Sequence, residues 1–168
     1  ALKRLRAEMK NTKAMLSFIN EIRIVGHLEH PNIVPIHDVG RDSNEIYYFV
    51  MKYTPGETLM DIINKLKSGH KKTHIDFPFE RRIKIFEELL QAVEFAHFHG
   101  IIHRDIKPSN VIIGDHGEVT MMDWGIAKYL KGNHEKNKQN TLLEKFEQDI
   151  ISFNNRTADE KMKIGEKE

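Results

Sequence analysis

Apolar residues recur at helical spacing in two stretches of this chain. Between residues 12 and 28 they stand mostly three or four positions apart, and Pro31 ends the pattern. The apolar positions of this stretch are Met15, Leu16, Ile19, Ile22, Val25 and Leu28. Between residues 79 and 98 the apolar face is wider, and Gly100 follows as the type of residue that commonly ends helices. The spacing therefore predicts two amphipathic helices, 12–28 and 79–98.

Shorter apolar runs predict strands and one further helix. Residues 33–39 and 46–51 are separated by a polar, glycine-containing turn, which predicts a hairpin. Residues 111–113 and 119–122 flank a Gly-Asp-His-Gly turn and predict a second hairpin. Between the two hairpins, residues 59–66 predict a short helix that a Ser-Gly pair brings to an end.

The composition changes after Tyr129. Residues 131–140 carry no apolar side chain that a core could bury, and residues 156–168 are again rich in charge. Between them, apolar positions from Leu142 to Phe153 predict one amphipathic helix. We therefore expect the chain to divide after residue 130.

Charge and composition exclude several classes of function. The chain has 168 residues, with 26 Lys and Arg against 25 Asp and Glu, and a net charge of +1. Such a balance gives no extended field for nucleic acid or anionic membranes. The absence of cysteine excludes disulfides and thiolate metal sites, and no apolar run approaches the roughly 20 residues that span a bilayer. We expect no nucleic-acid partner, no membrane contact from this segment and a cytoplasmic location, with any membrane anchor lying elsewhere in a longer protein.

The strongest chemical pattern is His-Arg-Asp-Ile-Lys-Pro-Ser-Asn at residues 103–110, followed by Asp123-Trp124-Gly125. It brings together two carboxylates, an ammonium group and a carboxamide. Phosphoryl transfer from a magnesium nucleotide needs these groups: one carboxylate to deprotonate a hydroxyl, a lysine to neutralise phosphate charge, and oxygens to hold a hard cation. Each group alone would be weak evidence, but order, spacing and chemistry agree here.

These residues resemble the catalytic loop and the D-x-G motif of the eukaryotic-type protein kinase family, in its bacterial serine/threonine form. Upstream phrases that match the family in the same order are Ala1-Leu2-Lys3, Glu21, His30-Pro31-Asn32-Ile33-Val34 and Ile46–Tyr53. The resemblance spans residues 1 to about 130 and implies an α+β fold, the two-lobe protein-kinase fold in part. The parts expected are the end of the small-lobe sheet, the C-helix, the hinge and the start of the helical large lobe.

The resemblance also implies an internal piece of a kinase domain. A Gly-rich loop and two strands would precede Ala1, residues 131–168 would form a long activation segment, and an A-P-E motif would follow Glu168. A chain without these parts is expected to be inactive on its own.

The resemblance assigns roles to four residues around the catalytic loop. Asp105 would be the catalytic base, and Lys107 would balance charge on the transferred phosphoryl group. Asn110 and Asp123 would be the Mg²⁺ ligands. A loop aspartate that caps backbone groups is the alternative for Asp105.

It also implies an ATP site on the small-lobe side. Lys3 would contact the α- and β-phosphates and pair with Glu21, although a strand-edge lysine and a surface helix glutamate would give the same sequence. The remaining residues implied for adenine are Ala1 and Ile112 on its two faces and the hinge residues Met51, Lys52 and Thr54. The implied cofactors are ATP and Mg²⁺.

Two neighbours of the catalytic residues have implied supporting roles. Trp124 stands where the family usually has phenylalanine, and it would stack with His103, Val25 and Ile36. Arg104 would meet a phosphorylated residue of the activation segment. The acceptors available for that phosphorylation are Thr141, Ser152 and Thr157.

Lys107 favours a kinase for serine and threonine, because tyrosine kinases usually carry Ala-Ala-Arg or Arg-Ala-Ala there. The expected function is transfer of the γ-phosphoryl group of ATP to Ser or Thr hydroxyls of a protein substrate. A pseudokinase or nucleotide-binding regulatory module, and a kinase for a small molecule, are the alternatives. A metal site built from His97, His99 and His103 is disfavoured, because no acidic or thiol ligand completes it.

Overall fold

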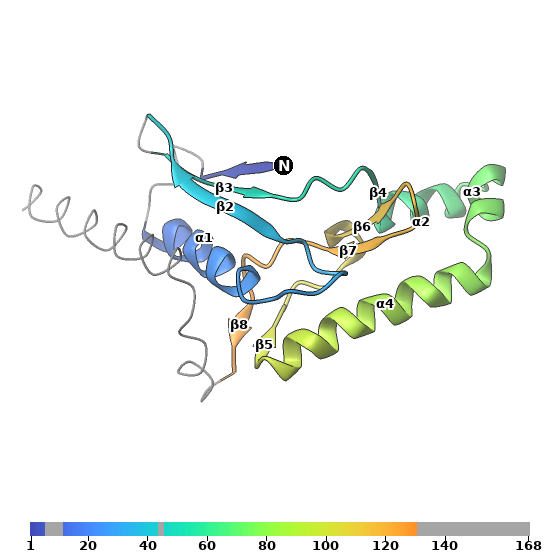
Figure 1. Ribbon diagram of the computed structural model, residues 1–168. Helices are drawn as coiled ribbons and strands as arrows, with labels where there is room; N and C mark the ends of the chain where they lie inside the picture. Colours follow the sequence, from blue (N-terminus) through green and yellow to red (C-terminus); the bar gives the residue numbers. More distant parts are fainter. Residues whose placement is uncertain (6–11, 44–45, 131–168) are drawn as a thin grey trace, which may run out of the picture. The chain divides into compact units, whose positions relative to one another are not determined.

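The computed structural model describes residues 1–5, 12–43 and 46–130 (Figure 1), all of which belong to one compact unit, Ala1–Asn137. The helix predicted between Leu142 and Phe153 and the three candidate phosphorylation sites lie outside the described residues. The division of the chain after residue 130 stays a prediction.

A three-stranded antiparallel sheet forms the N-terminal part. β3 (Tyr47–Met51) is its central strand, with β1 (Leu2–Arg4) on one side and β2 (Ile36–Arg41) on the other. The predicted strand 33–39 begins later than expected, because Pro35 has no N–H to donate to a sheet ladder. Ile33 forms a parallel bridge to Met121 instead.

Helix α1 (Thr12–Val25) lies alongside this sheet (Figure 1) and packs on it through the rings of Phe18 and Phe49, whose centroids are 5.2 Å apart. The helix was predicted to reach residue 28. It ends at Val25 because the helical bonding stops after Gly26 N–H, which still donates to Ile22 O. The next two amides bond three residues back, as in a 3₁₀ turn: His27 N–H donates to Ile24 O at 3.2 Å and Leu28 N–H to Val25 O at 3.0 Å. Leu28 is nevertheless fully buried, so its contribution to the apolar pattern was interpreted correctly.

The second part combines small sheets with helices. The predicted helix 79–98 is confirmed as α4 (Phe79–Phe98), and the short predicted helix as α2 (Leu59–Lys67). The second hairpin is confirmed as β6 (Val111–Gly114) and β7 (Val119–Met121), with β4 (Gly56–Thr58) added beside β6. The remaining elements are α3 (Lys71–Asp76), β5 (Ile101–Ile102), the 3₁₀ turn η2 (Pro108–Asn110) and β8 (Lys128–Tyr129).

The main hydrophobic cluster joins these elements around Trp124, which is fully buried. It includes Ile24 and Val25 of α1, Ala92 and Ala96 of α4, and Met121 of β7. Because this cluster draws on both helices and on the strand that leads to Asp123, packing fixes α1 and α4 relative to residues 121–127. The fold is α+β, as predicted.

Candidate active site

The loop between β5 and β6 is built on a buried histidine. His103 is 2 % exposed; its Nδ1 accepts a hydrogen bond from Asp105 N–H (3.2 Å), and its Nε2 lies 3.1 Å from Met122 O. Burial lowers the pKa of His103. The imidazole is therefore neutral at pH 7, and the two bonds place its proton on Nε2, where it is donated to the carbonyl.

Asp105 is held by two side chains from its own loop. Lys107 Nζ donates to Asp105 Oδ2 at 2.7 Å, and Asn110 Nδ2 donates to the same oxygen at 3.0 Å and to the Asp105 carbonyl at 2.9 Å. The hydrogen bond from Lys107 is the main cause of a lowered Asp105 pKa. The carboxylate is thus ionised at neutral pH, and both side-chain donors bind Oδ2.

Asp123 follows β7 in a strained backbone conformation. Its φ is 60° and that of Arg104 is 66°, and these are the non-glycine residues with positive φ within the described part of the chain. Left-handed backbone is uncommon for side-chain-bearing residues and tends to persist where a functional site imposes it. Both residues belong to motifs that the sequence singled out, which supports a functional reason for the strain.

Lys3, from β1, joins two acidic residues. Its Nζ lies 2.7 and 2.8 Å from the two carboxylate oxygens of Glu21 and 3.4 Å from Asp123 Oδ1. The Glu21 side chain is only 8 % exposed, so the surface-glutamate alternative does not describe this pair. Burial raises the pKa of Glu21, and the ion pair with Lys3 opposes that rise.

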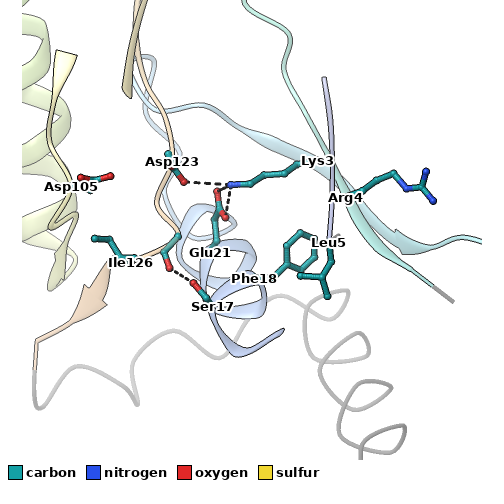
Figure 2. Close-up of a pocket in the computed structure, with 10 residues that line it drawn as sticks. Lys3, Arg4, Leu5, Ser17, Phe18, Glu21, Asp105, Asp123 and Ile126 are labelled. Atoms are coloured by element: carbon teal, nitrogen blue, oxygen red, sulfur yellow. Dashed lines mark hydrogen bonds and ion pairs between the residues drawn. The ribbon is translucent and has the colours of Figure 1, made fainter. Parts of the chain in front are cut away.

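These side chains meet in one cleft of about 380 Å³ (Figure 2). Lys3 points across it towards Glu21 and Asp123, and Asp105 lines its opposite side. Lys107 and Asn110 do not line this cleft themselves but bind Asp105 directly. The structure therefore brings together the residues that were expected to handle phosphate and hydroxyl chemistry.

The residues expected around adenine are not among those that line this cleft. Ala1 and Met51 pair in the sheet, with Met51 N–H donating to Ala1 O at 2.8 Å, and Lys52 N–H donates to Pro35 O at 3.1 Å. Thr54 is buried, and its hydroxyl has no hydrogen-bond partner among the described residues. Ile112 is half-buried in β6, where it pairs with Thr58 and Thr120.

The predicted stack around Trp124 is confirmed. The His103 and Trp124 rings have centroids 4.4 Å apart, Val25 belongs to the same hydrophobic cluster, and Ile36 packs against it. The indole N–H of Trp124 has no partner among the described residues. A buried donor without a partner costs free energy of folding. The apolar contacts of the indole ring in this cluster offset that cost.

The donor atoms near Asp123 suit a hard cation. Because Asn110 Nδ2 is engaged with Asp105, the amide oxygen is the atom of Asn110 available as a ligand, alongside the half-exposed carboxylate of Asp123. No group of three or more His, Cys, Asp or Glu side chains arranged for a metal occurs in the described residues. Asn110 and Asp123 fit Mg²⁺ only together with water and phosphate oxygens, which is how Mg²⁺ is commonly held.

Three contacts at the site were not expected from the sequence. Ser17 Oγ donates to Gly125 O at 2.6 Å, Asn20 Nδ2 donates to Ala127 O at 2.9 Å, and Arg104 Nε donates to Ile126 O at 2.6 Å. The signal available was that Ser17 and Asn20 stand four and one positions before Glu21 on a predicted helix. Residues three or four positions apart lie near one another on a helix surface, as Ser17 does to both Asn20 and Glu21.

The protein kinase domain family matches residues 1–146 of the chain. Curated proteins are also similar over most of it. The serine/threonine-protein kinase PknD of Protochlamydia amoebophila is 34 % identical over 141 residues, covering 81 % of this chain and 14 % of the relative. PknD of Chlamydia trachomatis serovar L2b is 32 % identical over 163 residues, covering 93 % and 16 %.

A relative from another bacterial group gives the same result. The serine/threonine-protein kinase PknB of Mycolicibacterium smegmatis is 38 % identical over 136 residues, covering 77 % of this chain and 20 % of the relative. The chain thus spans between 14 % and 20 % of the length of these three relatives. Among the described helices, none has the length and apolar character needed to cross a bilayer.

Proposed function

Because this chain belongs to the protein kinase domain family, we propose that the protein carrying it transfers the γ-phosphoryl group of ATP to serine or threonine hydroxyls of proteins. One observation carries the proposal: the ammonium of Lys3 lies within hydrogen-bond distance of Glu21 and Asp123, in a cleft that Asp105 also lines. A cation, a metal-binding carboxylate and a base are then within reach of one transferring group.

Asp105 would act on the acceptor. Its Oδ2 is engaged by Lys107 and Asn110, so Oδ1 is the oxygen left to accept a hydrogen bond from the substrate hydroxyl. The hydroxyl oxygen forms a bond to the γ-phosphorus while the bond from that phosphorus to the β,γ-bridging oxygen breaks. The hydroxyl proton passes to Asp105, and ADP leaves with the bonding electrons.

Lys3, Asn110 and Asp123 would act on the nucleotide. Bound Mg²⁺ would neutralise negative charge on the phosphates, and Asn110 and Asp123 would hold it. Lys3, kept in position by Glu21, would bind phosphate oxygens, and Lys107 would offset charge on the transferred group. Adenine would lie between Ala1 and Ile112, near the hinge residues Met51, Lys52 and Thr54.

The direct test is transfer from γ-labelled ATP by the full-length protein. We expect label on protein serine and threonine, and none on tyrosine, after acid hydrolysis and separation of the phosphoamino acids. Nucleotide binding without transfer would support a regulatory nucleotide-binding module instead. Label that appears only in small molecules would support a small-molecule kinase.

The fall of kcat/KM at acid pH should depend on Lys107. The hydrogen bond from Lys107 holds the pKa of Asp105 below its ordinary value of 3.8, so the base stays ionised until the pH falls below that value. In Lys107→Met this pKa rises, and protonation of the base begins at higher pH. We expect kcat/KM of the variant, relative to that of the wild type, to be constant at neutral pH and to fall as the pH is lowered from 5 towards 4, because the Asp105 pKa then lies closer to its ordinary value.

Lys65→Met is the matched control for that profile, because Lys65 pairs with Glu57 outside the cleft. Its kcat/KM relative to the wild type should be independent of pH. A constant ratio for Lys107→Met across the same range would contradict the role of Lys107 in keeping Asp105 ionised.

A further inference from the structure

Three successive carbonyl groups follow Asp123, and each accepts a hydrogen bond from a side chain. Gly125 O accepts from Ser17 of α1, Ile126 O accepts from Arg104 of the catalytic loop, and Ala127 O accepts from Asn20 of α1. In the order of these carbonyls, the first donor comes from α1, the second from the catalytic loop and the third again from α1. Residues 125–127 are thus bonded on one side to the helix that carries Glu21 and on the other to the loop that carries Asp105.

The first α1 donor, Ser17, shares one side of the helix with Glu21. It precedes Glu21 by four positions and Asn20 by three, spacings that make helix residues neighbours, and Figure 2 shows Ser17 and Glu21 both facing the cleft. Serine and asparagine are modest helix formers, because their side chains compete for backbone groups. Here their side chains donate to backbone carbonyls that are 108 and 107 residues away in sequence. They therefore stabilise a tertiary contact.

Gly125 lies close to side chains of α1 and to Asp123. A Cβ at this position would lie 3.4 Å from Asp123 Oδ1, 3.4 Å from Glu21 Oε2 and 3.9 Å from Ser17 Oγ. These are ordinary van der Waals distances, and they show that Asp123, Glu21 and Ser17 all lie close to residue 125, where Ser17 makes its hydrogen bond. The same close approach keeps Glu21 and Asp123 near enough to share Lys3.

We propose that Ser17 and Asn20 are positioning residues that couple the Lys3–Glu21 ion pair to the orientation of Asp123. They do so through their hydrogen bonds, which hold residues 125–127 against α1. This inference rests on the proposed kinase function. When both bonds are made, Glu21 and Asp123 face the same ammonium. When they are broken, residues 125–127 lose these hydrogen bonds to α1, and the ion pair and the metal-binding carboxylate can separate.

The test compares Ser17→Ala, Asn20→Ala and the double variant in the full-length protein. We expect each single change to lower kcat/KM about fivefold, the factor that corresponds to one net hydrogen bond, and the double change to lower it about 20-fold. Ser17→Thr keeps the hydroxyl and should restore most of the loss. Asn64→Ala is the matched control, because Asn64 is an exposed asparagine on α2, and its kcat/KM should equal that of the wild type.

A second readout separates positioning from loss of stability. Trp124 is the single tryptophan of this chain and is fully buried beside the segment. With any tryptophan outside residues 1–168 replaced by phenylalanine, acrylamide should quench Trp124 more strongly in the double variant than in the wild type at 25 °C, well below unfolding. Ser17→Thr and Asn64→Ala should be quenched like the wild type.

The outcomes test the positioning role of Ser17 and Asn20 separately from the proposed kinase function. Wild-type kcat/KM and wild-type quenching in the double variant would overturn the positioning role, even if its Tm fell. If the double variant does not fold, Ser17→Ala against Ser17→Thr decides the question, since equal activity in those two would also overturn it. Should the wild-type protein transfer no phosphate, the proposed function fails, whereas the quenching comparison still tests the coupling.

Discussion

Asp105→Asn is expected to lower kcat for phosphate transfer about 10³-fold, within the range that a general base contributes. The change removes the basic carboxylate while leaving an oxygen of the same size. Lys107 and Asn110 both donate to Oδ2, so the amide oxygen that replaces it can keep both bonds. The backbone bond from Asp105 N–H to His103 is unaffected. The loss is therefore expected in chemistry and not in folding.

The measurement pairs single-turnover transfer with nucleotide affinity. Asp105 is assigned to the acceptor hydroxyl, so the Kd for ATP should stay within about twofold of the wild type. Asp115→Asn, at an exposed turn residue between β6 and β7, is the matched control and should retain full activity. Transfer by Asp105→Asn within tenfold of the wild type would remove Asp105 from the role of base.

The sequence predicted which side chains gather at the candidate site because most of them stand close together in the chain. Asp105, Lys107 and Asn110 lie within a span of six residues, and the hairpin that separates them from Asp123 has a clear turn. Local spacing therefore fixed most of this geometry. Lys3 and Glu21 needed the family resemblance, because the 2.7 Å contact between their side chains joins a strand to a helix 18 residues further on.

Elements held by capping or by long-range pairing were missed. α3 has no apolar periodicity and begins at a cap in which His70 Nδ1 accepts from Thr73 N–H at 3.3 Å, a bond that no hydrophobic pattern announces. β5 and β8 are two residues each and pair across 26 positions. The contacts of Ser17 and Asn20 were missed for the same reason, since their acceptors are backbone carbonyls over 100 residues away.

The wide apolar face of α4 shows a further limit of periodicity. Ala92 and Ala96 are fully buried, but Phe86 is 59 % exposed and Leu90 51 % exposed in the described part of the chain. A hydrophobic pattern identifies residues that suit burial without identifying what buries them. The bounds of the helix were therefore predicted correctly. Which of its apolar residues face the core was seen only in the structure.

Lys3→Met is expected to lower kcat/KM about 10²- to 10³-fold, the loss typical of removing one preorganised donor to developing charge. The Nζ it removes is bonded to both Glu21 oxygens and to Asp123 Oδ1. Without it, the buried carboxylate of Glu21 and the carboxylate of Asp123 face each other with no cation from β1 between them. Steady-state kinetics in the full-length protein measure the loss, and Lys65→Met, far from the cleft, should show none.

The same variant carries a signature in its stability, because Lys3 opposes the burial-driven rise in the Glu21 pKa. Removing Lys3 lets that pKa rise further above its ordinary value of 4.5. A carboxyl whose pKa is raised by folding contributes stability below its unfolded pKa and loses that contribution as the pH rises through the folded value. The stability deficit of Lys3→Met, measured by urea unfolding, should therefore be smallest near pH 4.5 and grow towards neutrality.

Adding Glu21→Gln to Lys3→Met separates this ion-pair effect from a general loss of packing. The amide cannot ionise, so the double variant should be more stable at pH 7 than Lys3→Met alone, and its deficit should no longer grow with pH. Kinase activity should stay low in the double variant, because Lys3 is still absent. A pH-independent deficit in Lys3→Met, unchanged by Glu21→Gln, would mean that Lys3 does not set the ionisation of Glu21, and its assigned place between the two carboxylates would be wrong.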